Sequence, residues 1–387
     1  MKGVILVENS FVHPYMPNSV PENKKAMLDE LGINSVEDIY KSIIPDELLY
    51  KERLDIPEPI RSEYELKRHV MGILNRDITT EEYTSFLGAG CYKHQVPAIC
   101  DEINSRGEFL TAYCGDTYSD HGKMQAIFEY TSMMGELLDT DVVSYTTYDG
   151  GQAVASSLRM AVRAVREKGM AGKVILVPKT MNPEIYSQVV QYCRNVAEVR
   201  KIAYEPETGL MDLEELKEQL AKKNVAAVFF ENPTYLGNFE TRGEEIAKLA
   251  HDAGAYCVVQ TEVAALGIME SPVNQGADIV CGDIQPLGMH IQFGGGQAGF
   301  IACNQNMDLV EQFPTYMYGI TETEKEDTYG WGRAMNYRSS HGSRENAKEY
   351  FGTETGLWAI TAGVYLASMG PQGMYELCET IIQNAAY

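Results

Sequence analysis

The sequence predicts an α/β protein with a mostly parallel sheet, helices on both faces of that sheet, and a helical N-terminal arm. Two observations indicate this class. From Phe86 onward, short apolar runs alternate with amphipathic stretches of helical spacing, which is the pattern of right-handed strand–helix–strand crossovers. The composition, 44% apolar and 22% charged, is that of an ordinary globular protein, and 387 residues can form two domains.

Residues 1–85 are expected to form an entry arm of small helices outside the sheet. A first helical stretch is expected near Glu22–Leu31. Ser35, followed by two acidic residues, has the pattern of a helix cap. From Ser62 to Leu74 the apolar residues recur at helical spacing, which predicts a further helix.

Residues 86–312 are expected to form the large α/β domain. A boundary is expected near Gln312–Pro314, where strands give way to loop and helix, so that residues 313–387 form a third segment. The expected helices are Gln125–Leu138, Gln152–Val165, Pro183–Cys193, Asp212–Lys222 and Glu244–Ala253, and the expected strands are Val174–Val177, Glu198–Tyr204, Ala226–Phe230, Cys257–Glu262 and Ile279–Gln285.

Charge and cysteine content restrict the class of protein. The net charge of −23 argues against nucleic acid or an anionic membrane as a partner. No apolar run approaches the ~20 residues that cross a bilayer, and we expect no secretion signal because the apolar core of the N-terminus is too short. None of the eight cysteines is in Cys-x-x-Cys spacing, so we expect no metal site and a cytoplasmic location.

The most informative feature is a missing residue type, since no lysine or arginine occurs between Leu249 and Glu324. In enzymes that hold pyridoxal phosphate on a parallel sheet, an acid after one strand can pair with the pyridinium nitrogen, and a lysine after the next binds the cofactor covalently. Here Glu262 stands in the first place and Gln285 in the second. Because an amide cannot form an imine, we expect no covalent cofactor and no catalytic residue on this chain alone.

The loops at the carboxyl ends of the strands are the candidate binding sites, because ligands of open α/β sheets bind there. Asp149, Gly150 and Gly151 open a predicted helix, whose free N–H groups can bind a phosphate or carboxylate. The same residues can equally be an N-cap and a tight turn. The polar turn Glu231–Gly237 can likewise be a plain turn or can seat an aromatic ring beside a ligand.

Three further loops contain polar residues that can serve a site. The segment Thr111–Gly122 is too polar and aromatic for a core. The glycines Gly294–Gly296 allow close backbone approach to a ligand, or a strained turn without one. The charged stretch Arg338–Thr355 is a solvated helix face or a site loop. The candidate residues of these loops are Tyr113, Asp116, Tyr118, His121, Gln297, His341, Arg344 and Thr353.

Several long motifs, in one order, make the sequence recognisable. It resembles the first subunit of the two-subunit glycine decarboxylase, the pyridoxal phosphate component (P-protein) of the glycine cleavage system. The matching motifs run through nearly the whole chain. They are Ser85–Gly90, Ser105–Phe109, Tyr148–Gly151, Gly276–Val280, Gln285–Gly288, Phe293–Gly295, Val364–Ala367 and Gly370–Gly373.

The resemblance implies a pyridoxal-phosphate-transferase fold of type I with a seven-stranded, mostly parallel sheet. It implies that this subunit lacks the cofactor-binding lysine, and that a homologous, lysine-bearing partner subunit holds the pyridoxal phosphate. The implied reaction of the complex is that of glycine dehydrogenase (aminomethyl-transferring). Glycine is decarboxylated, and its aminomethyl group passes to the lipoyl group of a carrier protein. The implied partners are therefore the homologous subunit, the lipoyl carrier and a small amino-acid substrate.

The chain departs from the family pattern at three site loops. Cys114–Thr117 stands where the family usually has Thr-Pro-Tyr-Gln, Gly296-Gln297 replaces Pro-His, and Asn346–Thr353 replaces Lys-Ala-Thr-Ser-Asn-Ile-Cys-Thr. Two alternatives therefore stay open: a diverged complex that acts on another amino acid, or a non-catalytic protein whose pseudo-site of Asp149, Gly150, Gly151, Glu262 and Gln285 binds a small anion. Because the family continues beyond Tyr387, we expect the small C-terminal domain to be truncated.

Overall fold

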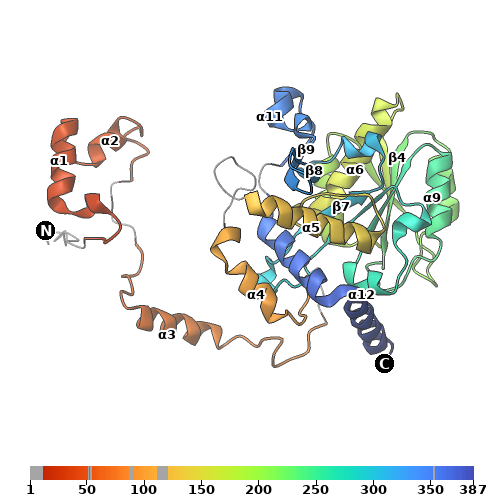
Figure 1. Ribbon diagram of the computed structural model, residues 1–387, viewed down its shortest axis with the longest axis horizontal. Coiled ribbons are helices and arrows are strands. Elements are labelled where there is room, and N and C mark those ends of the chain that lie inside the picture. Colours follow the sequence, from red (N-terminus) through yellow and green to blue (C-terminus); the bar gives the residue numbers. More distant parts are fainter. Residues whose placement is uncertain (1–11, 51, 53–54, 87–90, 111–120, 352–353) are drawn as a thin grey trace. The chain divides into compact units, whose positions relative to one another are not determined.

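The structure is a computed structural model that describes residues 12–50, 52, 55–86, 91–110, 121–351 and 354–387, with only the backbone of residues 121–122 (Figure 1). The chain divides into two compact units, Met1–Glu82 and Tyr83–Tyr387. The further division that the sequence predicts near residue 312 stays a prediction.

The described residues of the N-terminal unit form three α-helices and a short 3₁₀ turn. Helix α1 (Pro21–Leu31) ends at Gly32, whose left-handed φ of 66° suits glycine. Helix α3 (Glu63–Leu74) begins at Ser62, whose hydroxyl accepts a hydrogen bond from the backbone of Glu65. None of the residues of these two helices is buried.

Helix α2 (Glu37–Lys41) begins differently from the expected cap at Ser35. Its N-cap is Val36, which makes no side-chain cap bond. Instead, the carboxylate of Asp38 accepts hydrogen bonds of 3.1 Å from the backbone N–H groups of Asn34 and Ser35. The acid inside the helix thus organises the turn that precedes it.

The C-terminal unit is built on a seven-stranded sheet of order β1-β7-β6-β5-β4-β2-β3 (Figure 1). Strands β2 to β6 run parallel, whereas β7 is antiparallel to both β6 and β1. The mostly parallel sheet is therefore confirmed. The strands are β1 (Val142–Val143), β2 (Val174–Pro178), β3 (Glu198–Ile202), β4 (Val225–Asn232), β5 (Tyr256–Thr261), β6 (Ile279–Asp283) and β7 (Gly299–Cys303).

Helices cover both faces of the sheet, as the sequence predicts. Along β2, Ile175 and Val177 belong to the core shared with α6 and α7, whereas Val174 and Leu176 belong to the core on the opposite face with α5, α8, α9 and α12. This alternation follows from the two-residue repeat of a strand buried on both faces. The long helices are α5 (His121–Leu138), α6 (Gly150–Glu167), α7 (Pro183–Cys193), α8 (Leu213–Leu220), α9 (Gly243–Asp252) and α12 (Gly356–Ala386).

Shorter elements complete the second unit. A hairpin of β8 (Met317–Glu322) and β9 (Tyr329–Ala334) packs on α5, and α12 is bent at Gly370 and Pro371. In the described part of the chain, no helix is long and apolar enough to span a bilayer. The other short helices are α4 (Ala98–Asn104), α10 (Met307–Val310) and α11 (Ser340–Ser343), and the 3₁₀ turns are Pro17–Ser19, Gly107–Phe109, Val263–Gly267, Pro272–Gln275, Gln292–Gly294, Asn336–Arg338 and Arg344–Asn346.

Candidate functional site

Three carboxylates stand at the ends of three neighbouring strands. Glu231 lies at the end of β4, Glu262 follows β5, and Asp283 ends β6. Because these strands are parallel neighbours, their carboxyl ends meet at one edge of the sheet. Burial raises the pKa of each of the three carboxyl groups to about 7, although backbone N–H groups donate to all of them and oppose the rise.

Asp283 connects three loops at this edge. One oxygen accepts from the backbone N–H of Gly150 at 2.8 Å, and the other accepts from the N–H groups of Gln285 at 2.8 Å and Ala298 at 3.4 Å. The first of these donors belongs to the first turn of α6. A side chain of this chain thus takes the place that a bound anion takes at other helix N-termini.

The neighbouring groups at the start of α6 also have partners within the chain. Asp149 is the N-cap, and its carboxylate accepts from the backbone N–H of Gln152 at 2.6 Å. A Cβ on Gly151 would lie 2.7 Å from the amide of Gln188, so this glycine makes room for that side chain. The glycines of this motif therefore serve a cap and close packing in this structure.

Gln285 lies just after β6, at the position where enzymes that hold pyridoxal phosphate on a parallel sheet have the cofactor-binding lysine. Its side chain is fully buried. The amide nitrogen donates to the backbone carbonyls of Tyr92 at 3.0 Å and Met289 at 3.1 Å, and the amide oxygen accepts from the N–H of Tyr92 at 3.4 Å. Gln285 therefore joins the segment around residue 92 to the loop after β6.

These residues do not fit a covalently held pyridoxal phosphate. Position 285 offers an amide in place of an amine, and its hydrogen-bonding groups are already used. The N–H of Gly150 already binds Asp283. Among the described residues, no histidine, cysteine and acidic side chains are grouped so that three of them could hold a metal ion.

The residues 13–387 match the family model described as the glycine cleavage system P-protein. The chain belongs to this family. It is 36% identical to the probable glycine dehydrogenase (decarboxylating) subunit 1 of Pyrococcus horikoshii, over 96% of this chain and 81% of that protein. It is 34% identical to the protein of the same name from Staphylothermus marinus, over 97% of this chain and 80% of that protein.

Solved structures agree with this family assignment. A crystal structure of glycine decarboxylase (P-protein) in inhibitor-bound form matches this chain with a TM-score of 0.79 and 31% sequence identity. The match covers 95% of this chain and 78% of the chain in that structure. A sphingosine-1-phosphate lyase of Burkholderia pseudomallei has a TM-score of 0.56 at 12% identity, covering 88% of this chain and 76% of its own, which shows the fold alone.

The glycine loop before β7 is a strained turn in this member of the P-protein family. Gln292, Phe293 and Gly294 have consecutive positive φ values of 48°, 56° and 91°. A Cβ on Gly296 would lie 2.1 Å from the carbonyl oxygen of His290, so the backbone requires glycine there. Phe293 is 99% exposed, and Gln297, a half-buried residue, follows the turn.

The structure describes only some of the remaining predicted site residues. His341 lies in the short helix α11 and Arg344 directly after it, and both are exposed. Among the described hydrogen bonds and ion pairs, none joins either residue to the strand-end carboxylates. His121 begins α5, but its side chain is not described. The candidates Tyr113, Asp116, Tyr118 and Thr353 lie outside the described residues.

In the charged stretch Arg338–Thr355, residues 340–346 are mostly exposed, whereas Glu349 faces α6. Glu349 is only 12% exposed and contacts two arginines of α6, Arg159 and Arg163. The sequence contained one signal for this arrangement, since these two arginines lie four residues apart on a helix that is otherwise mostly buried. Half-buried arginines of this kind favour an acidic partner.

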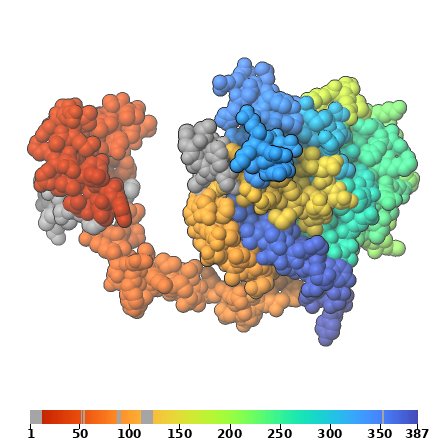
Figure 2. Space-filling model, viewed as in Figure 1, coloured from red at the N-terminus to blue at the C-terminus, as the bar shows by residue number. Residues whose placement is uncertain are grey.

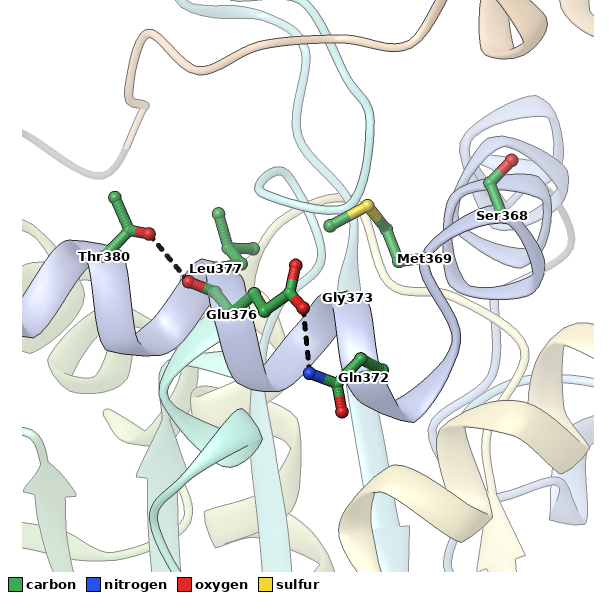
Figure 3. Close-up of a pocket in the computed structure, with 7 residues that line it drawn as sticks. All are labelled: Ser368, Met369, Gln372, Gly373, Glu376, Leu377 and Thr380. Atoms are coloured by element: carbon green, nitrogen blue, oxygen red, sulfur yellow. Dashed lines mark hydrogen bonds between the residues drawn. The ribbon is translucent and has the colours of Figure 1, made fainter.

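A groove lies at the bend of α12 and contains none of the strand-end carboxylates among its lining residues (Figure 3). All of its lining residues come from α12, and Gln372 donates a hydrogen bond to Glu376 within it. The last turns of α12 are exposed and project from the surface of the second unit (Figure 2). The lining residues are Ser368, Met369, Gln372, Gly373, Glu376, Leu377 and Thr380.

The raised pKa values of the strand-end carboxyl groups predict that the free energy of unfolding depends on pH. The substitution Glu262→Gln tests this prediction. The folded pKa of the Glu262 carboxyl group, about 7, lies above the reference value of 4.5, so wild-type stability is expected to fall as the pH rises from 4.5 to 7. Glu262→Gln does not titrate. We expect the stability of the variant relative to wild type to increase by about 2 kcal/mol between pH 4.5 and pH 8, a value reduced for partial exposure.

Urea unfolding at pH 5, 6, 7 and 8 measures this difference, with the same substitution at the exposed Glu244 of α9 as the control. A difference between wild type and Glu262→Gln that stays constant with pH would show that the Glu262 carboxyl group does not titrate in this range.

Proposed function

We propose that this chain is the lysine-free subunit of a glycine decarboxylase complex of the glycine cleavage system. Its partner is a homologous subunit that carries the lysine and the pyridoxal phosphate. The complex decarboxylates glycine and transfers the aminomethyl group to the lipoyl group of a carrier protein. Pyridoxal phosphate supplies the electron sink for the carbanion that remains when carbon dioxide leaves.

The observation that carries this proposal is that a chain of the P-protein family has a buried, hydrogen-bonded glutamine, Gln285, where a lysine would bind the cofactor. Relatives of this chain are named as the first subunits of a glycine dehydrogenase, which supports a second subunit as partner. At position 285 the chain has a buried amide with three backbone partners and no amine. The cofactor-binding amine must therefore come from another polypeptide.

The role of this chain's own residues is to support and complete the partner's site. Asp283 fixes the loops after β6 and before β7 relative to the start of α6. Held in this way, the loops present a defined surface at the carboxyl edge, where they can orient a small substrate and exclude water. Tyr113, Asp116, Tyr118, His121, Gln297, His341, Arg344 and Thr353 stay proposed contributors to that surface.

A cytoplasmic location is part of the proposal. All cysteines of the described residues are free thiols, including several that are fully buried. Free thiols persist in a reducing compartment, which supports this location.

A second candidate function is the same chemistry on a different amino acid. The altered segment Asn346–Thr353 favours it, because Glu349, which the resemblance matches to a serine of the family pattern, forms ion pairs with α6. The third possibility, binding of a small anion at the pseudo-site, is less well supported because Asp283 already binds the N–H of Gly150.

Reconstitution tests the proposed function. The chain, the lysine-bearing homologue from the same organism, and the two together are supplied with pyridoxal phosphate, a lipoyl carrier and glycine, and the release of carbon dioxide is measured. We expect no release from this chain alone and release from the pair. Release by the chain alone would contradict the proposal, and a pair that is inactive on glycine but active on alanine or serine would establish the second candidate.

A further inference from the structure

Glu349 lies at the centre of an ion-pair network on the side of α6. One of its oxygens accepts from Arg159 Nε at 2.6 Å and from Arg163 Nη1 at 3.1 Å. The other accepts from the hydroxyl of Ser156 at 3.1 Å. The side chains of Glu349, Arg159 and Arg163 are only 12%, 26% and 19% exposed, so water screens this network weakly.

The two arginines are held independently of Glu349. Arg159 donates to the backbone carbonyl of Tyr192 at 2.6 Å. Arg163 donates to the side-chain oxygen of Gln312 at 3.1 Å and to its backbone carbonyl at 2.8 Å. The positions of the guanidinium groups are therefore set by other parts of the chain, and the carboxylate of Glu349 attaches its own segment to them.

The two residues after Glu349 contact two other elements. The ring of Tyr350 packs edge-on against Tyr316, with 5.0 Å between ring centres. Phe351 donates its backbone N–H to the carbonyl of Pro314 at 2.8 Å, and its ring stacks on Tyr148 at 6.0 Å. Tyr148 directly precedes Asp149, the N-cap of α6.

The chain returns to the same stretch a few residues later. Thr355 donates its N–H to the hydroxyl of Thr146 at 3.0 Å, and its own hydroxyl donates to the carbonyl of Thr147 at 3.1 Å. Phe351 and Thr355 thus lie along residues 146–148, which lead to the carboxyl edge of the sheet. The position of Phe351 is therefore fixed by its contacts with Pro314 and Tyr148, and that of Thr355 by its contacts with Thr146 and Thr147.

We propose that Glu349 is a positioning residue that fixes Phe351 and Thr355 against residues 146–148 and so sets the aromatic pair of Tyr148 and Phe351 at the site shared with the partner subunit. The inference rests on the proposed function for its catalytic consequence. Glu349 acts through Phe351, and no contact between Glu349 and substrate is needed.

The charge of Glu349 is essential to this role. Removing it leaves two half-buried guanidinium groups, still held by Tyr192 and Gln312, that face a neutral side chain and bind it more weakly. The segment then loses its attachment to α6, while the rest of the second unit keeps its own core. A displacement of about 1 Å in a site wall can lower the rate by up to about 100-fold.

Glu349→Gln tests this role in the full chain paired with the lysine-bearing subunit. Two quantities are measured: the exchange rates of the backbone amides of Phe351 and Thr355, and kcat/KM for glycine. We expect exchange at both amides to speed up by about tenfold or more, since their hydrogen bonds open more often. We expect kcat/KM to fall about tenfold or more, with partner affinity within about twofold of wild type.

Lys348→Gln is the matched control. Lys348 is the neighbouring residue and pairs with Glu167 at 2.9 Å, but these side chains are 30% and 52% exposed. An ion pair in which one partner is half exposed to water contributes little, so we expect wild-type exchange and wild-type kcat/KM.

The outcomes separate the two proposals. Unchanged amide exchange in Glu349→Gln would overturn the positioning role, whatever the activity. Faster exchange with wild-type kcat/KM would restrict Glu349 to stability and would likewise overturn the role. If the wild-type pair releases no carbon dioxide from glycine, the proposed function fails, and the exchange rates still decide whether Glu349 fixes the segment.

Discussion

Replacing Gln285 by lysine is expected to destabilise the protein by about 3 kcal/mol and to leave it without covalently bound cofactor. The Gln285 side chain is fully buried, and its amide both donates to and accepts from Tyr92. A lysine can donate to the carbonyl groups, but it cannot accept from the N–H of Tyr92. It also brings a positive charge into a site that is closed to solvent.

Urea unfolding measures the loss of stability, and borohydride reduction with peptide mass mapping in the presence of pyridoxal phosphate detects any covalent attachment. Gln292→Lys is the control, because Gln292 is exposed in the loop before β7. It reports the effect of an accessible lysine on the same edge of the sheet. A Gln285→Lys protein that is as stable as wild type and carries the cofactor at position 285 would refute the structural role of Gln285.

The sequence was sufficient to predict the parallel part of the fold, because that part depends on local patterns. The segment that forms β4, for example, begins with six consecutive apolar residues, among them two valines and two phenylalanines, and Pro233 follows its last residue. Strands β1 and β7 were not predicted. Strand β1 has only two residues, and β7 follows a glycine loop, so neither produces a distinct period. Their antiparallel pairing is a tertiary property that no local pattern encodes.

The candidate site was predicted in part for the same reason. The absence of an amine at position 285 is visible in the sequence, and Asp149 has the local pattern of an N-cap. The partners of Gln285 and Glu349 are not visible. Tyr92 lies 193 residues before Gln285, and Arg159 lies 190 residues before Glu349. Contacts of this kind depend on how the strands are ordered in the sheet.

The choice between a cap and an anion site at α6 shows where local reasoning ends. Both interpretations use the same residues, Asp149 to Gly151, and the same free N–H groups. The residue that distinguishes the two interpretations is Asp283. It lies 133 residues after Gly150 in the sequence, so the local pattern around Gly150 gives no indication of it. Only the juxtaposition of β6 with the start of α6 shows that a carboxyl group of this chain accepts a hydrogen bond from that loop.

Asp283→Ala is therefore expected to destabilise the protein by about 3 kcal/mol. Three backbone N–H groups, those of Gly150, Gln285 and Ala298, lose their acceptor. Each unsatisfied buried donor costs about 1 kcal/mol or more. The loops after β6 and before β7 lose their common attachment to α6, so the activity of the reconstituted pair is also expected to fall. Thermal unfolding and the release of carbon dioxide measure the two effects.

The response of Tm to inorganic phosphate distinguishes two effects of Asp283→Ala: loss of the carboxyl group at the start of α6, and a general loss of stability. The substitution frees the first N–H of α6 and removes the negative charge beside it, so inorganic phosphate is expected to raise the Tm of the variant more than that of wild type, relative to chloride at equal ionic strength. Asp283→Asn is the matched variant, because its amide oxygen still accepts one of the N–H groups and its loss of stability should be smaller. Equal stability of wild type and Asp283→Ala would mean that the carboxylate does not hold the three loops together. An identical response of both proteins to phosphate would mean that Asp283 does not occupy an anion position at α6.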